Sequence, residues 1–181
     1  KQDYRTDVPN ILYTGNDGSD ETRNNTLKAI FKTPLMYEPG TDTLYSDVDY
    51  MLLGFVVEKV TGEKLDKFCE DTFYKPMGLT HITFNPLQNG FGKNDCAATE
   101  LNGNTRDGNI SFDGIRTDTI QGEVHDEKAY YCMGGVSGHA GLFSNAEDLA
   151  RLAYAMISGG YGNEEFFSSK VIDQFTAPAD D

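Results

Sequence analysis

The stretch DTLYSDVDYMLLGFVVEKVTG, residues 42–62, joins a polar turn to a segment that is apolar nearly all round. Ser46, with Asp49 three residues later, has the pattern of a capping box, and Gly62 is the kind of residue that ends a helix. The stretch therefore predicts a helix from Ser46 to Gly62. Because its apolar residues are not confined to one face, we expect this helix to be buried on most sides.

Tyr45, immediately before the predicted cap, has two interpretations on local sequence alone. In the first, its ring packs against Tyr50, the fourth helical residue, as a hydrophobic staple. In the second, its phenol lies beside the positive end of the helix dipole, where a phenolate is favoured and can act as a base. The local pattern favours the staple.

Four further helices are predicted from apolar residues at helical spacing between capping and breaking signals. They span residues 20–31, 65–73, about 144–158 and about 168–175. Residues 86–122 are instead rich in Asn, Gly, Asp and Thr, which predicts a long loop that is functional or mobile. The fold class is therefore mainly α (α+β), with long loops and at most a few short strands.

Composition excludes several classes of partner. The chain has 181 residues and a formal net charge of -14, which would repel nucleic acid and anionic lipid. The apolar block 51–57 is too short to span a membrane. Three scattered cysteines give neither a disulfide framework nor a CxxC motif. The chain opens on Lys1-Gln2-Asp3-Tyr4 without a Met or a signal peptide, so we expect an excised segment.

Three stretches together resemble the middle of the serine β-lactamase-like family, which includes class C β-lactamases, low-molecular-weight penicillin-binding proteins and esterases. In order they are LYSDVDYMLLGFVVEKVTG, FYKPMGLTHITFNP and GEVHDEKAYYCMGGVSGHAGLFSNAEDLARLAYAMI. The resemblance runs from about Phe31 to Phe175 and is closest to a branch that in some bacteria accompanies a family 3 glycoside hydrolase. It implies the helical portion of a β-lactamase/transpeptidase-like fold, in which a helical region is inserted into an α/β sandwich.

Such proteins use Ser-x-x-Lys, Tyr-x-Asn, and a late Lys-Thr-Gly or His-x-Gly. Tyr45-Ser46-Asp47 matches the second element with Asp in place of Asn. The resemblance implies that Tyr45 is catalytic and helps manage the proton of the nucleophile, with Asp47 and Ser46 as substrate-binding positions. Asp47 departs from the pattern, because an ionised carboxylate cannot donate a hydrogen bond as an amide can.

The other two elements are missing from the sequence. No serine has Lys three residues later, and there is no Gly-x-Ser-x-Gly elbow. His139-Ala140-Gly141 fits His-x-Gly by letter, but a capped helix follows it, whereas the family's motif lies on a strand. We therefore expect residues 1–181 to be a single truncated domain between the Ser-x-x-Lys and the final motif, with 86–122 on the active-site side.

Other chemical patterns are weaker. His125-Asp126 has the form of a base and its orienting acid, but no nucleophile stands beside it in sequence, which favours a loop-stabilising hydrogen bond. The histidines lack metal-ligand spacing, so we expect neither a metal nor a cofactor. The glycines at 134, 135, 138 and 141 lack the Lys-Ser/Thr ending of a phosphate loop and favour close backbone packing instead.

The resemblance implies a serine hydrolase that acts through an acyl-enzyme on an amide or ester carbonyl in a β-lactam, a D-alanyl peptide or an ester. It also implies a periplasmic or extracytoplasmic bacterial location. Without a nucleophile, the 181 residues alone are expected to be inactive. Two alternatives remain: a non-catalytic cell-wall peptide-binding or structural module, and an autonomous hydrolase that uses His139 or His125 with an unrecognised serine.

Overall fold

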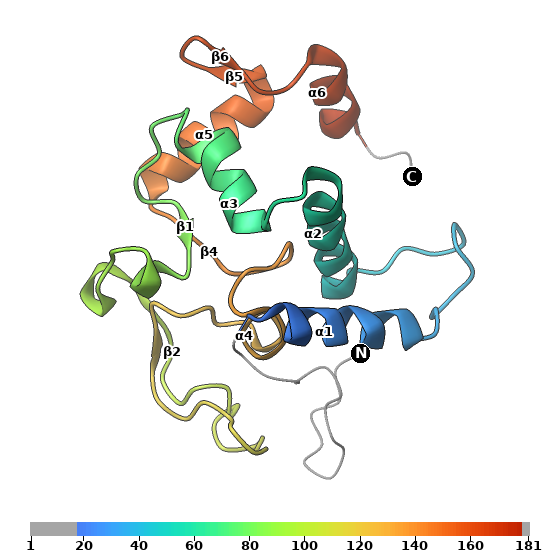
Figure 1. The fold of residues 1–181 in the computed structure, drawn as a ribbon, viewed down its shortest axis with the longest axis vertical. Helices are drawn as coiled ribbons and strands as arrows, with labels where there is room; N and C mark the ends of the chain where they lie inside the picture. The colour runs from blue at the N-terminus through green and yellow to red at the C-terminus, as the bar shows by residue number, and fades with distance from the viewer. Residues whose placement is uncertain (1–17, 179–181) are drawn as a thin grey trace. The chain divides into compact units, whose positions relative to one another are not determined.

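The structure is a computed structural model that describes residues 18–178 of the chain (Figure 1). The prediction that concerns Lys1 to Tyr4 lies outside the described residues. The described residues divide into two compact units, the first formed by residues 18–65 and 84–142 and the second by residues 66–83 and 143–178. The chain passes between the units after Leu65 and again within the short strands β1 (Thr83–Phe84) and β4 (Leu142–Phe143).

The first unit contains the helices α1 (Asp20–Lys32), α2 (Asp47–Thr61) and α4 (Glu127–Met133). Ser19 caps α1, Ser46 caps α2, and Gly62 ends α2 in the left-handed conformation at φ 77°. The predicted helices 20–31 and 46–62 are thus confirmed. The sequence missed α4, because a helix of only seven residues, with six of them buried, shows no amphipathic period.

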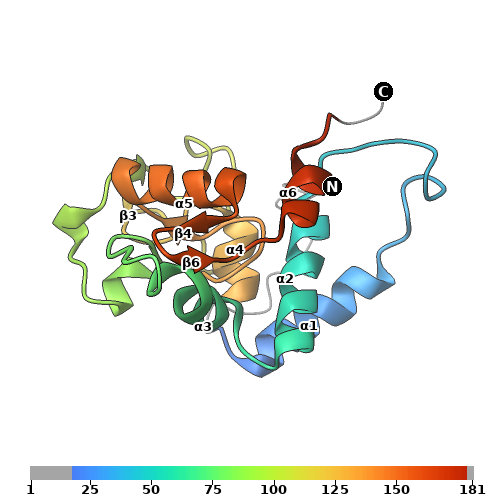
Figure 2. The same cartoon turned by 90° about the horizontal axis from the view of Figure 1, so that it is seen from above.

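Arg23 joins the three helices of this unit. Its guanidinium donates to the backbone oxygens of Met133 at 3.0 Å and Val136 at 2.9 Å. It also pairs with Glu58 of α2 at 2.7 Å, which links α1 to α2 (Figure 2). Because the Arg23 side chain is only 6% exposed, these partners are needed to offset the cost of burying its charge.

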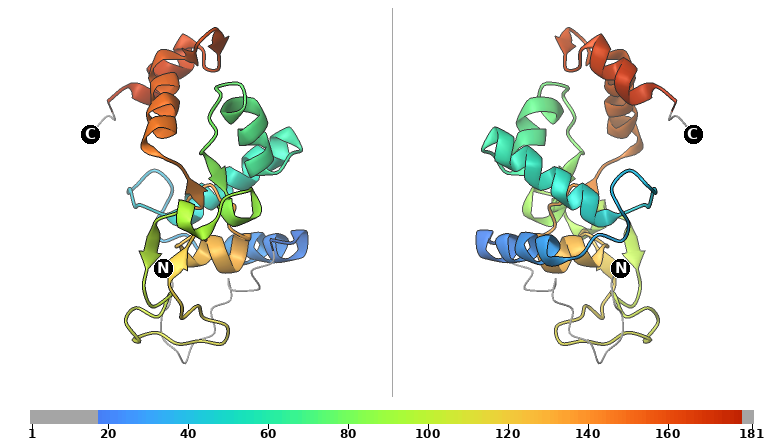
Figure 3. Two further views of the ribbon diagram at one scale, coloured as in Figure 1. Left: turned by 90° about the vertical axis from the view of Figure 1, so that its left-hand side faces the viewer. Right: turned by 90° about the vertical axis from the view of Figure 1, so that its right-hand side faces the viewer.

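The core of the first unit lies among these helices, and α1 contacts α4 along it (Figures 1 and 3). The buried residues of this core are Ile30, Met51, Tyr131, Cys132 and Met133. Only Met51 and Gly54 of α2 are buried, however, while Leu53, Val56 and Val60 are 55%, 54% and 80% exposed. The expectation that α2 is buried on most sides is therefore wrong for the described residues.

Glycines let α2 approach the loop that follows α4. A Cβ added at Gly138 would lie 2.2 Å from the backbone oxygen of Tyr50, and one added at Gly54 would lie 3.1 Å from the nitrogen of Gly138. No larger residue fits position 138 without displacing the helix. The prediction that these glycines allow close backbone packing is confirmed here.

Residues 86–122 have more structure than a simple loop. They contain the 3₁₀ turns η2 (Pro86–Gln88) and η3 (Lys93–Asp95) and the strands β2 (Ala98–Glu100) and β3 (Ile120–Gln121). The two strands pair antiparallel, with Ala98 opposite Gln121 and Glu100 opposite Ile120. Whether this segment lies on the active-site side stays a prediction.

The second unit holds most of α3 (Leu65–Cys69), its π-helical continuation η1 (Glu70–Tyr74), α5 (Ala146–Ser158) and α6 (Ser169–Thr176). The strands β5 (Gly160–Tyr161) and β6 (Glu164–Glu165) form an antiparallel hairpin between α5 and α6 in the sequence. The core of the second unit consists of Tyr74, Met77, Leu79, Ile82 and Ala155.

Helix starts in the second unit follow their caps. Ser168 accepts from the backbone N–H of Val171, as the predicted start of the last helix requires. At α5 the prediction was one residue early, because the cap is Asn145, which accepts from the N–H of Asp148 at 2.8 Å, and not Ser144. The described residues as a whole are mainly helical with strands of two or three residues, so the mainly α class is confirmed.

Candidate active site

The first turn of α2 carries the Tyr45-Ser46-Asp47 motif. Ser46 has extended backbone geometry, and its hydroxyl accepts from the N–H of Asp49 at 3.4 Å. Tyr45 is 85% exposed and Tyr50 is 52% exposed. A ring as exposed as that of Tyr45 buries almost no surface, so the hydrophobic staple is not formed. The motif therefore presents a free-standing phenol just ahead of a helix N-terminus.

Asp47, the first residue of α2, is bound by a lysine that the sequence reasoning did not single out. The ammonium of Lys128, in the first turn of α4, donates to Asp47 Oδ2 at 2.8 Å. The side chain of Lys128 is 11% exposed and that of Asp47 is 31% exposed. This ion pair joins the starts of two helices that are 81 residues apart in the sequence.

Asp126 caps α4 and begins a second chain of hydrogen bonds. Its Oδ1 accepts from the N–H of Ala129 at 2.8 Å and from Nε2 of His139 at 2.8 Å. His139 Nδ1 lies 2.8 Å from Ser137 Oγ. Because an ionised carboxylate can only accept, Nε2 is the ring nitrogen that donates to Asp126. Every polar atom of this imidazole thus has a partner.

Electrostatics keep Asp126 ionised. Burial by itself would raise its pKa, but the hydrogen bonds from His139 and Ala129 and the nearby positive charges, including Lys128, lower the pKa to about 2. A negative charge at the start of α4 is also favoured by the helix dipole. The Asp126 carboxylate is therefore a fixed anion that orients His139.

His125 does not pair with Asp126 as a base and its orienting acid, and the favoured alternative, a loop-stabilising hydrogen bond, is the one formed. His125 is half-exposed, and its Nε2 lies 3.7 Å from Glu100 Oε2. Its backbone oxygen accepts from the Asn104 amide at 3.1 Å and from Arg116 at 3.2 Å, which stabilises the loop. The imidazole that faces Asp126 is His139, which lies in a bend ahead of β4.

Ser137, His139 and Asp126 have the connectivity of a catalytic triad, but the serine is inaccessible. Ser137 is only 3% exposed, and the His139 side chain is 3% exposed as well. A nucleophile must reach a substrate carbonyl, and a serine this buried cannot do so without a movement of its loop. We assign the chain of hydrogen bonds to the support of α4 and of the loop after it.

One group of three potential metal ligands occurs among residues 18–178. Asp47, Asp126 and His139 have ligand atoms within 4.8 Å of one another. The group differs from the histidine set that the spacing argument considered. Because Lys128 already binds Asp47 and the His139 N–H is committed to Asp126, the positive charge that these carboxylates require comes from the protein. We assign no metal to this group.

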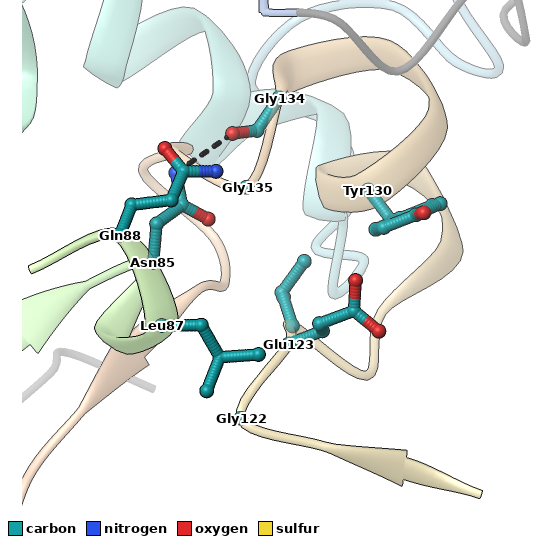
Figure 4. A pocket seen from close by; sticks show the side chains of 9 residues that line it. Asn85, Leu87, Gln88, Gly122, Glu123, Tyr130, Gly134 and Gly135 are labelled. Atoms are coloured by element: carbon teal, nitrogen blue, oxygen red, sulfur yellow. Dashed lines mark hydrogen bonds between the residues drawn. The ribbon is translucent and has the colours of Figure 1, made fainter. Parts of the chain in front are cut away.

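A cavity of about 160 Å³ lies at the other end of α4 (Figure 4). Its wall includes Leu87, Glu123 and Tyr130, and on one side Asn85 donates to the backbone oxygen of Gly134 at 2.9 Å. Ligand pockets usually measure roughly 300–1,000 Å³. The cavity is smaller than that and is not lined by the Tyr45 motif, so it is not the candidate active site.

Comparison with known protein families identifies the family of the chain. The family model described as Beta-lactamase matches residues 5–179. The chain belongs to the beta-lactamase family. The resemblance to serine β-lactamase-like proteins, predicted from three stretches of sequence, is thereby confirmed.

Among proteins of known sequence, the beta-lactamase-family chain is 57% identical over 157 residues to a protein of Escherichia coli K12 named "Putative D-alanyl-D-alanine carboxypeptidase". A protein of the same name from Salmonella typhi is also 57% identical over 157 residues. These alignments cover 86% of the chain but only 36% of each relative. The chain thus spans about a third of the length of these relatives.

Solved structures show the same fold at low identity. A D-amino acid amidase from Ochrobactrum anthropi SV3, in complex with D-phenylalanine, matches 94% of this beta-lactamase-family chain with a TM-score of 0.57 and 15% identity. An octameric penicillin-binding protein homologue from Pyrococcus abyssi matches 97% with a TM-score of 0.60 and 16% identity. The chain covers 45% and 40% of these two structures, respectively.

Sequence reasoning singled out Tyr45, Ser46 and Asp47 as candidates but missed Lys128, which binds Asp47, and Ser137, which bonds to His139. Lys128 and Ser137 lack a recognisable motif, since both lie in a glycine-rich stretch that was predicted as a loop. One signal was present: a carboxylate where the family has an amide requires a compensating cation. Only the structure shows which lysine supplies it.

Proposed function

We propose that the longer protein to which this chain belongs is a serine hydrolase that forms an acyl-enzyme with D-alanyl-D-alanine peptides of the cell wall. The observation that carries the proposal is the 57% identity to the E. coli protein named as a carboxypeptidase for this bond. The exposed phenol of Tyr45 at the start of α2 supports it. The reaction would take place outside the cytoplasm, where cell-wall peptides occur.

In this proposal Tyr45 acts on the proton of a serine supplied by sequence outside these 181 residues. The phenol stands just ahead of a 15-residue helix and is exposed, so it is open to a nucleophile and a substrate from the rest of the protein. The serine attacks the peptide carbonyl, the leaving D-alanine takes a proton, and water then hydrolyses the ester. The 181 residues alone would be inactive, because Tyr45 has no nucleophile to activate.

The experiment is intact-mass spectrometry after incubation with a penicillin and, separately, with a fluorophosphonate. The 181-residue chain is compared with the full-length protein. We expect an adduct on the full-length protein alone, with the modified serine outside these residues. D-alanine release from a D-alanyl-D-alanine peptide would then separate this substrate from simple esters.

Other outcomes would contradict the proposal. An adduct on the short chain would mean that it contains a nucleophile, and Ser137, 2.8 Å from His139, would be the first to replace. If the short chain hydrolysed an ester and its His139→Ala variant kept the same turnover, an autonomous hydrolase that uses His139 would be excluded. No adduct on either protein would favour a cell-wall peptide-binding module without catalysis.

A further inference from the structure

We infer that Lys128 is a positioning residue of the proposed active site, which acts through Asp47 to fix the first turn of α2 and so the direction of Tyr45. The inference rests on the proposed function, and it concerns a residue outside the Tyr-Ser-Asp motif. Its basis is the 2.8 Å ion pair between Lys128 Nζ and Asp47 Oδ2.

The stability of α4 does not explain the place of Lys128. The residue stands in the first turn of α4, where the helix dipole disfavours a cation. It is also 9% exposed, although a buried ammonium is costly unless it is paired. We therefore attribute the presence of a lysine at position 128 to its contact with another element, the start of α2.

The first turn of α4, from which the Lys128 side chain extends, is held by several contacts. Asp126 caps α4 and binds His139, while Glu127 pairs with Arg106 at 2.7 Å. The Glu127 side chain is 8% exposed, so this second pair is also partly withdrawn from solvent. The first turn of α4 is thus fixed on several sides, and Lys128 extends from it to α2.

The residues around Tyr45 have little packing of their own, and the next contacts of α2 with the core are those of Val48 and Met51. Tyr45 is 85% exposed and is not oriented by packing of its own. The Ser46 cap is long, at 3.4 Å, whereas the ion pair at Asp47 is short. Asp47 is two residues from Tyr45 along the chain, so a displacement of its backbone moves the phenol. Misplacement of a reacting group by about 1 Å can cost roughly 100-fold in rate.

The pair also accounts for Asp47 itself. The resemblance implies Asn at this position, and an amide needs no cation beside it. With Asp in its place, a buried ammonium neutralises the carboxylate and the two side chains form one unit. The double variant Asp47→Asn with Lys128→Met removes both charges together and restores the amide. We therefore expect the double variant to work better than either single variant.

The test uses the full-length protein and the rate of acylation by a fluorescent penicillin at saturating concentration. For Lys128→Met we expect a fall of roughly 10–100-fold in the acylation rate. Lys128→Arg should recover most of the rate, and the double variant should recover more than Asp47→Asn alone. The control is Lys75→Met, which breaks the ion pair of Lys75 with Asp71 at 2.9 Å in the second unit and should leave the acylation rate unchanged.

Hydrogen exchange of the amides of residues 47–51 provides a readout that does not depend on activity. We expect faster exchange there in Lys128→Met and not in Lys75→Met. Equal effects of the two variants on acylation and exchange would overturn the inference and leave an ordinary structural ion pair. If the wild-type protein is not acylated at all, the proposed function fails, and faster exchange in Lys128→Met alone would still show that Lys128 holds this turn.

Discussion

Tyr45 is the residue on which the proposed chemistry depends, and it has almost no packing of its own. Its surface is 85% exposed, and the residues after it fix its backbone: Ser46 as the helix cap and Asp47 through Lys128. An exposed tyrosine held in this way suits a group that must meet a substrate and a serine from another part of the protein. Substitutions at Tyr45 and at Tyr50 can show whether the hydroxyl of Tyr45 has a role that the neighbouring tyrosine lacks.

In the full-length protein, Tyr45→Phe should lower the acylation rate by roughly 10²–10⁴-fold, because the change removes only the hydroxyl that transfers the proton. The rate is measured by stopped-flow mixing with a penicillin. Tyr50→Phe is the matched control, since Tyr50 lies on the first turns of the same helix and is also exposed. An unchanged rate in Tyr45→Phe would refute the base assignment.

Asp126 gives the fold a defined sensitivity to acid. Its pKa is lowered from 3.8 to about 2, so its ionised form stabilises the folded state at pH values above about 4. This contribution is lost as the pH falls from about 4 to about 2, and its size is roughly 2 kcal/mol. The stability of the protein should therefore fall across this interval.

Asp126→Asn should remove this part of the acid dependence. Asparagine keeps the helix cap, so the variant loses the charge but not the bond to Ala129. We expect its free energy of unfolding to be roughly 2 kcal/mol below wild type at pH 7 and to decline less between pH 4 and pH 2. Urea unfolding at a series of pH values measures both, with Asp113→Asn, an exposed position, as the control. Parallel acid profiles for wild type and Asp126→Asn would contradict the assignment.

At the scale of elements, the active-site side of the first unit depends on how closely α2 approaches the loop 134–141. The backbone oxygen of Tyr50 would lie 2.2 Å from a Cβ at position 138. That oxygen belongs to a helix whose capped first turn also carries Asp47. Glycine at 138 is therefore required by the contact between two elements and not by a turn of its own backbone.

Gly138→Ala should destabilise the protein by roughly 1–3 kcal/mol, because α2 or the loop must move to admit the methyl group. In the full-length protein the same change should slow acylation, since it displaces the turn that carries Tyr45. Gly92→Ala is the control, because Gly92 has a φ of -91° and its added Cβ would meet only Asp95 at 3.4 Å. Equal thermal midpoints for Gly138→Ala and wild type would show that the contact is looser than described.

At the scale of the whole molecule, the described residues expose many large apolar side chains. Those that are at least 70% exposed include Phe31, Leu35, Met36, Val60, Ile157 and Phe175. Apolar side chains in such numbers usually mark a surface that another segment or protein covers. The relatives are about three times as long as their matched part, and their remaining sequence is the natural candidate for this cover. Within residues 18–178, no helix combines the length and apolar character needed to cross a bilayer.

Val60 offers a test of this cover, because it is 80% exposed on α2. In the 181-residue chain, Val60→Lys should change the free energy of unfolding by less than about 0.5 kcal/mol and should reduce aggregation. In the full-length protein the same change should destabilise by several kcal/mol, because it would bury an unpaired charge. Thermal unfolding of both proteins measures the effect of Val60→Lys on stability. A neutral effect in the full-length protein would mean that this face of α2 is solvent-exposed there as well.

The sequence by itself determined the features that depend on neighbours along the chain. Caps and breakers a few residues apart fixed α1, α2 and α6, and the Tyr45-Ser46-Asp47 motif together with two further stretches was enough to predict the family. Local signals were weaker for α5, where Asn145 and Ser144 are both good caps, and they were absent for the short, buried α4. Helices as short as α4 form because tertiary packing stabilises them.

Only the tertiary structure decided which side chains meet. Lys128 reaches Asp47 across 81 residues, and Asp126 binds His139 and not the adjacent His125, because successive residues at the start of a helix point in different directions. The exposure of α2 could not be predicted from the sequence either. A helix that is apolar on all sides is expected to be buried, but its sequence does not tell which segment buries it. Hydrogen-bond partners that are distant in the sequence produce no periodic or spaced pattern from which they could be predicted. The contact of Lys128 with Asp47, next to Tyr45, is of this kind.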